Sequence, residues 1–354
     1  MEIPAEPYNH LRVELEILER YGNYDDAANA MWGSLGQGGP DLLSQDPLND
    51  YCELELTSDS RNIKRPLAVP WDLYETWLMS KWTELIDSDP DEPDVQAFLE
   101  RHPSLLPAAA DDVGRGHHGA CWDAVITQPR LKGLGRDRIP DFMWVRRDTS
   151  TVHIICIEIE APRKQWFTES GWATAELNQA LDQILDWKLW FSNPENMLSF
   201  RHAYIPAELG YRRIEVQYIL VYGRDAEFRI GRSRHKRPDV LRAKRDLIPR
   251  ASEFLYTFDQ LRPAKDAKYV SSISGMRGDF SMRGVPPTIG TGEATKTLAA
   301  EISNIESAIS MTPLISDRRR AYLIQRWQYW RDEALRSENG MAPGVLWESG
   351  YFDE

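Results

Sequence analysis

The stretch 139-IPDFMWVRRDTSTVHIICIEIE-160 determines how this chain folds, because it contains two apolar runs joined by a polar, turn-like segment. If Asp148 pairs with Thr151 across a tight turn, the two runs form an antiparallel hairpin. Apart from a few acids, both faces of these runs are apolar, which is typical of strands covered on both sides. The sequence therefore predicts a buried hairpin inside a larger sheet with helices on both faces.

Three carboxylates interrupt this hairpin: Asp141, Glu158 and Glu160. In the expected register Asp141 lies opposite Glu158, with Cβ atoms roughly 4.5–5.5 Å apart, and Glu160 follows on the same face. Like charges this close repel unless a proton or a cation lies between them, and Mg²⁺ is a common partner of carboxylates. A register shift of one residue would separate them, and strand ends emerging into water are the simpler alternative. We predict a metal site here.

Composition sets wide limits. A chain of 354 residues with 42% hydrophobic content has room for two domains or one elaborated domain. No apolar run reaches the roughly 18 residues that cross a bilayer, so we expect a cytoplasmic protein without a membrane contact. The three Cys are widely spaced and predict buried thiols rather than disulfides or a zinc site.

Charge is distributed unevenly along the chain. Residues 1–61 hold 13 acidic and 3 basic side chains, whereas residues 201–250 hold 13 basic and 6 acidic ones. The acidic segment is expected to be solvated surface or to bind a basic partner, and the basic segment to be a solvated face or to bind a polyanion. The basic candidates are Arg232, Arg234, Lys236, Arg237, Arg242, Lys244 and Arg245.

The order of helical and strand-like patterns predicts an α/β fold with a mixed sheet. Helices are expected at 8–32, from Trp71, from about residue 92 and at 174–191, and strands at 122–128, 139–146 and 152–160. We divide the chain into four parts: an acidic, mainly helical region at 1–89, a core at 90–262, a Gly/Ser/Pro-rich linker or mobile loop at 263–293, and a helical hairpin (294–310 and 317–337) with a tail at 294–354.

The pair "IPDF" and "EIE" resembles the core of PD-(D/E)xK nucleases, and an ordered set of segments extends the likeness. With "EPDVQAFLERHPSLL", "NQALDQILDW", "ILVYGR" and "FLYTFDQL", residues 90–262 resemble the nuclease domain of the Shedu family of antiphage defence proteins. The resemblance implies a restriction-endonuclease-like core, flanked by helices, that cuts DNA with Mg²⁺ or Mn²⁺.

The resemblance also implies roles for single residues. Asp141 and Glu158 match the metal-binding acids, Glu92 matches a polar position where a further acid is often kept, and Gln183 matches the family glutamine, with the aromatic Trp187 one turn later. We expect Gln183 to face the acids with Trp187 on the same side of the helix, and Leu181, Ile184 and Leu185 to turn largely into the core. Glu160 stands where the family has Lys. Lys164 can return an ammonium group by bending back, with Arg163 and Lys188 as weaker candidates.

Two functions follow from these patterns. The first is a metal-dependent DNA endonuclease or nickase in antiviral defence, with Asp141, Glu158 and Glu160 at the metal and the basic segment on DNA. The second is a catalytically silent module that binds DNA or a partner, which Glu160 in place of Lys favours. Aromatic helices near the C-terminus favour a homo-oligomer, and the sequence names no trigger or regulatory partner.

Overall fold

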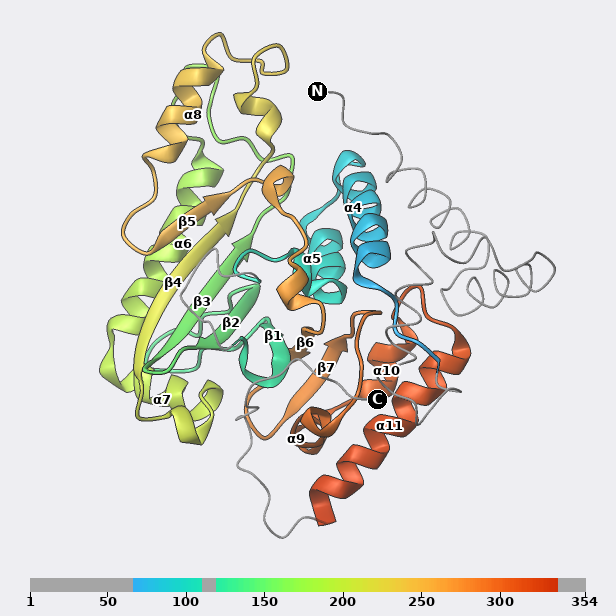
Figure 1. Ribbon diagram of the computed structural model, residues 1–354. Coiled ribbons are helices and arrows are strands. Elements are labelled where there is room, and N and C mark those ends of the chain that lie inside the picture. The colour runs from blue at the N-terminus through green and yellow to red at the C-terminus, as the bar shows by residue number, and fades with distance from the viewer. Residues whose placement is uncertain (1–65, 110–118, 337–354) are drawn as a thin grey trace, which may run out of the picture.

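The computed structural model describes residues 66–109 and 119–336. An eight-stranded sheet in the order β5-β4-β3-β2-β1-β6-β7-β8 runs through them (Figure 1). Three neighbouring pairs are antiparallel and four are parallel, so the sheet is mixed, and the predicted α/β class is confirmed. The strands are β1 (Ala124–Thr127), β2 (Phe142–Arg147), β3 (Thr151–Ile159), β4 (Arg213–Val221), β5 (Glu253–Tyr256), β6 (Ser271–Ser274), β7 (Phe280–Gly284) and β8 (Ile302–Ser303).

Helices flank this sheet (Figure 1). They are α4 (Trp71–Asp87), α5 (Glu92–Arg101), α6 (Ala175–Ser192), α7 (Pro194–Tyr204), α8 (Pro238–Asp246), α9 (Glu293–Glu301), α10 (Ile305–Ser310) and α11 (Asp317–Arg336). Within the described residues, none of these helices is both long and apolar enough to pass through a membrane.

The β2–β3 hairpin has the predicted register. Phe142 pairs with Ile157, and the Asp148 N–H donates to the Thr151 carbonyl at 2.9 Å. Every residue of both strands is buried, including the charged ones, because other layers cover both faces. This register brings Asp141, just before β2, opposite Glu158.

Helices α5 and α6 cover opposite faces of the sheet. Thr127 pairs with Phe142 and hydrogen-bonds Glu100 on α5, whereas Glu158 accepts a hydrogen bond from Gln183 on α6. Phe142 and Glu158 point to opposite faces, because Phe142 pairs with Ile157 and side chains alternate along a strand. The carboxylates therefore lie at the end of β3, where the α6 face meets the start of α5.

Residues 263–293 are not a linker, and the prediction of a mobile loop there is wrong. They contain β6 and β7, and the small residues serve close packing rather than flexibility. Ser272 Oγ donates to the Glu100 carbonyl at 2.5 Å, and a Cβ on Gly284 would lie 2.4 Å from that same oxygen. Ser and Gly are required because the strands press against the α5 backbone.

The C-terminal helical pair differs from the predicted hairpin. The helix expected at 294–310 is divided into α9 and α10 by the short strand β8, which adds to the edge of the sheet beside β7. The second helix matches α11, which packs against α9 and α10. The helix expected at 8–32 and the acidic segment 1–61 lie outside the described residues.

Candidate functional site

Asp141 is held by the backbone around it. Its Oδ2 accepts the Ile159 N–H at 2.8 Å, and its carbonyl accepts the Gln128 N–H at 2.8 Å and the Gln96 side-chain amide at 3.4 Å. These bonds come from the segments after β1 and at the end of β3 and from α5. They fix this carboxyl at the point where the two predicted strands begin and end.

Glu158 lies beside Asp141 and accepts a hydrogen bond from a side chain of α6. Gln183 Nε2 donates to Glu158 Oε1 at 2.5 Å, so the predicted orientation of this glutamine is confirmed. Glu158 is only 7% exposed, and its Oε2 receives no donor from the described residues. Trp187 is buried one turn further along, whereas Leu185, expected in the core, is 37% exposed.

Glu160, the first residue after β3, brings two more charged groups to the same place. Its Oε2 forms an ion pair with Lys164 Nζ, so Lys164 does bend back toward the acids. Glu92, at the first position of α5, lies close enough to hydrogen-bond Glu160. The site thus combines four carboxyl groups with one ammonium group.

The two weaker cation candidates are directed elsewhere. Arg163 pairs with Asp91 at 2.6 Å, and Lys188 pairs with Glu253 at 2.7 Å. Among the cations considered for the missing family lysine, Lys164 is the one that contacts the acids.

Burial and mutual repulsion raise the pKa of three of these acids, Asp141, Glu158 and Glu92. Burial raises the pKa of Asp141 to about 7; the Ile159 N–H opposes this shift, and the charges of Glu92 and Glu160 add to it. Burial and then the charges of its neighbours raise the pKa of Glu158 well above its ordinary value. Burial also raises the pKa of Glu92. A cation placed among these groups would replace the protons that they otherwise retain.

The chemistry of the donor set fits a hard divalent cation. Carboxylate oxygens are the ligands that Mg²⁺ and Mn²⁺ prefer, and Glu158 Oε2 is a buried oxygen without a donor. In the described parts of the chain, no three His, Cys, Asp or Glu side chains already stand in a metal-binding arrangement. Binding a metal here therefore requires the carboxylates to turn toward a common centre.

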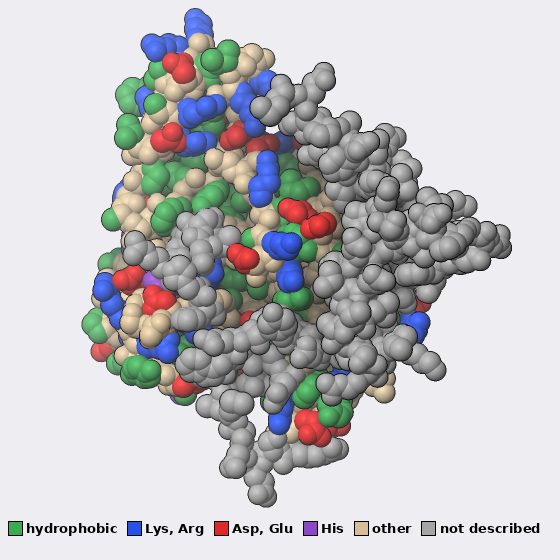
Figure 2. Space-filling model, viewed as in Figure 1, with side chains coloured by type: hydrophobic (Ala, Val, Ile, Leu, Met, Phe, Trp, Pro, Cys, Tyr) green, Lys and Arg blue, Asp and Glu red, His purple; other side chains and the backbone are tan. Residues whose placement is uncertain are grey.

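The seven predicted DNA-binding residues lie on α8 and the loop before it, and Figure 2 shows Lys and Arg side chains gathered at that end of the molecule. Arg232 and Lys236 are exposed, and their side chains bond to no described residue. Arg245 instead is 13% exposed, pairs with Asp246 at 2.9 Å and lies over the Phe228 ring, which indicates a structural role. The others are tied to backbone carbonyls or a carboxylate: Arg234, Arg237, Arg242 and Lys244.

A further basic segment was not among the residues predicted to bind DNA. The loop before Asp141 carries four cations within residues 130–138, and Arg138 pairs with Asp186 on α6 at 2.9 Å. The local run of Arg and Lys immediately before "IPDF" was a signal that could have identified this loop.

A comparison with protein families finds a match over this part of the chain. Residues 89–261 match the family described as Shedu protein SduA, C-terminal, a range within one residue of the predicted core at both ends. A search of curated proteins finds no match to the chain. The matched segment, 173 of the 354 residues, carries all four carboxyl groups, Gln183 and Lys164, and it is similar to the C-terminal domain of the Shedu family of antiphage defence proteins.

Proposed function

We propose that this chain is a metal-dependent DNA endonuclease or nickase of antiphage defence. The observation that supports this best is the convergence of Asp141 and Glu158 at one sheet end, with Gln183 bonded to Glu158. Buried carboxyls that repel one another destabilise a fold, and such groups are concentrated at functional sites. The family match supports the same reaction class.

In this proposal Asp141 and Glu158 hold Mg²⁺ or Mn²⁺, with Glu160 and Glu92 beside them. When bound, the ion supplies charge stabilisation at the scissile phosphate and a more acidic water. Gln183 holds Glu158 Oε1 so that the other oxygen faces the site. Glu160 accepts the proton of the attacking water as its oxygen bonds to phosphorus; the scissile P–O bond then breaks, and the departing oxygen takes a proton from solvent. Lys164 Nζ beside Glu160 offsets negative charge on the phosphate.

DNA contacts in this proposal come from the α8 region. Arg232 and Lys236 are exposed cations that can neutralise backbone phosphates without first breaking a described contact. A homo-oligomer formed through the C-terminal helices is part of the same proposal, because α11 exposes 45% of Tyr329 and 75% of Leu335.

The test is nicking of supercoiled plasmid with Mg²⁺ or Mn²⁺, with Asp141→Ala and Glu158→Ala beside the wild type. Asp182→Ala is the matched control, since Asp182 is an exposed acid on α6. The proposal predicts metal-dependent nicking that both site variants lose by at least about 100-fold and that the control retains. Equal nicking by all four proteins would refute it.

A silent DNA-binding module is the second candidate, and one observation favours it. Lys164, the cation at the site, is neutralised by Glu160, the residue that replaces the family lysine. For this candidate, DNA binding persists in wild-type protein with EDTA, no nicking occurs with either metal, and Asp141→Ala changes neither result.

A further inference from the structure

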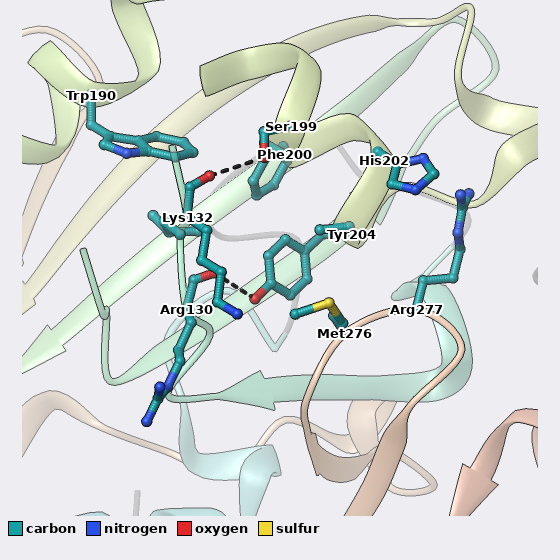
Figure 3. Close-up of a pocket in the computed structure, with 11 residues that line it drawn as sticks. Arg130, Lys132, Trp190, Ser199, Phe200, His202, Tyr204, Met276 and Arg277 are labelled. Atoms are coloured by element: carbon teal, nitrogen blue, oxygen red, sulfur yellow. Dashed lines mark hydrogen bonds between the residues drawn. The ribbon is translucent and has the colours of Figure 1, made fainter. Parts of the chain in front are cut away.

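Apart from the carboxylate site, a cavity lies between α6, α7, the loop after β1 and the β6–β7 turn (Figure 3). Its volume is about 240 Å³, and none of the described residues that line it is acidic. One part of the wall is aromatic: Trp190, Phe200 and Tyr204. Another part is basic: Arg130, Lys132, His202 and Arg277.

The loop that carries two of these cations is fixed by α7. Tyr204 donates its hydroxyl hydrogen to the Arg130 carbonyl at 3.0 Å, and Ser199 donates to the Lys132 carbonyl at 3.0 Å (Figure 3). The next residue of the loop, Gly133, packs closely against Asn196 of α7, because a Cβ added to Gly133 would lie 2.2 Å from Asn196 Oδ1. The backbone under both cations is therefore positioned before any ligand arrives.

The two loop cations of this pocket lack anionic partners among the described residues. In the described part of the chain, Arg130 and Lys132 form no ion pair, and Arg277 Nη1 donates to the Ile205 carbonyl at 2.7 Å. Trp190 is 5% exposed, and its Nε1 is buried without an acceptor. Glu208 and Glu301 lie near Arg277 but do not line the cavity. An anion with an attached ring would satisfy both the cations and the aromatic wall.

We propose that this pocket binds one nucleotide of the DNA strand whose cleavage is proposed above, and the inference rests on that function. The phosphate lies on Arg130 and Lys132, and the sugar or base lies against Trp190 and Tyr204. The cavity is smaller than the ~300–1,000 Å³ of typical ligand sites, so it takes one nucleotide and not two.

Its position suits a strand that also reaches the carboxylates. Trp190 follows Gln183 by seven positions on α6, which is about 10 Å at ~1.5 Å per residue. That distance is about three nucleotide steps at ~3.4 Å each. The loop that carries Arg130 also leads directly into Asp141. One strand can therefore occupy both places.

The test measures binding without cleavage. A fluorescein-labelled single-stranded oligonucleotide is titrated in EDTA with wild type, with the double variant Arg130→Gln/Lys132→Gln, and with Lys265→Gln as an exposed control. We expect the double variant to bind about 10-fold more weakly, with a salt slope lower by about 1 for each lost cation. The control should match wild type. Both altered side chains are exposed, and circular dichroism melts verify folding.

Unchanged affinity and salt slope in the double variant would refute the proposal that this pocket binds DNA. If deoxyadenosine monophosphate binds wild type as tightly as the oligonucleotide does, the assignment of the pocket to a DNA strand is overturned, because a free nucleotide then suffices. If wild type cuts no plasmid while the double variant still loses binding, the pocket stands and the cleavage proposal fails. If wild type cuts plasmid and the double variant binds normally, the pocket alone fails.

Discussion

Replacing Asp141 by Asn should stabilise the metal-free protein, although it alters a proposed metal ligand. The change removes one negative charge from a cluster of four carboxyl groups. It keeps the local geometry, because the Asn oxygen can still accept the Ile159 N–H that Asp141 accepts at 2.8 Å. Electrostatic repulsion in the cluster is therefore lost without a broken hydrogen bond.

The sign of the effect follows from the raised pKa of Asp141, which is 3.8 ordinarily and about 7 in the fold. Between these values the folded state binds more protons than the unfolded state, so the unfolding free energy falls as pH rises through this window. At ~1.36 kcal/mol per pH unit the loss is at most about 4 kcal/mol. Since the charge of Asp141 also raises the pKa of Glu158, the two acids repel each other, and we expect Asp141→Asn to gain about 2–4 kcal/mol above neutral pH.

Urea unfolding monitored by tryptophan fluorescence in EDTA, at about pH 5 and about pH 8, measures this difference. The variant should exceed wild type at the higher pH by the stated amount and by much less at the lower pH. Mg²⁺ or Mn²⁺ should raise the midpoint of wild type but not of the variant. Asp182→Asn, an exposed change on α6, should behave as wild type. An Asp141→Asn protein that is less stable than wild type at pH 8 would refute the electrostatic reasoning.

Three further predictions use single substitutions. Glu160→Lys should reduce plasmid nicking at least about 10-fold, because it removes the proposed proton acceptor; increased nicking would instead favour the silent module. Gln183→Leu leaves Glu158 Oε1 without its donor and should cost about 1–3 kcal/mol in urea unfolding together with most of the nicking, whereas Gln179→Leu, exposed one turn earlier, should cost neither. Gly223→Ala should lower thermal stability, because φ is +57° there and a Cβ would lie 2.6 Å from the Lys164 carbonyl; Gly231→Ala, at φ +83° in open space, isolates the backbone strain of about 1–2 kcal/mol.

The sequence was most informative where one local pattern allowed one geometry. Because both faces of the two strands are apolar, the tight turn at Asp148 and Thr151 alone set the register, and the structure has this register. The same turn brought Asp141 opposite Glu158. The resemblance to Shedu nuclease domains likewise indicated that Gln183 faces the acids, and the hydrogen bond to Glu158 confirms it.

Long-range packing was what the sequence did not reveal. Ser and Gly are residue types common in loops. At positions 272 and 284 they are required instead because β6 and β7 pack against the backbone of α5 and leave no room for larger side chains. That requirement comes from a helix about 170 positions away in the chain, as the Ser272–Glu100 hydrogen bond shows. Leu185 is apolar and was expected in the core, yet it is exposed because α6 turns Gln183 and Trp187 inward instead.

Charge balance explains why Glu160 and Lys164 belong together. With a lysine at position 160, as in the family, and Lys164 kept, the three ionised acids Glu92, Asp141 and Glu158 would leave a charge of about −1, which one divalent ion would offset. With Glu160 in that position, Lys164 offsets the added carboxylate through the ion pair, yet four acids against one ammonium leave about −3. If the site holds metal as proposed, one divalent ion would not neutralise that charge, and the site would also retain a proton or take a second ion. The raised pKa values of Asp141 and Glu158 show that a retained proton is available. For a single-ion site that retains this proton, we expect nicking to be fastest near the pH at which the proton is lost. For a two-ion site, we expect the nicking rate to rise with every further deprotonation.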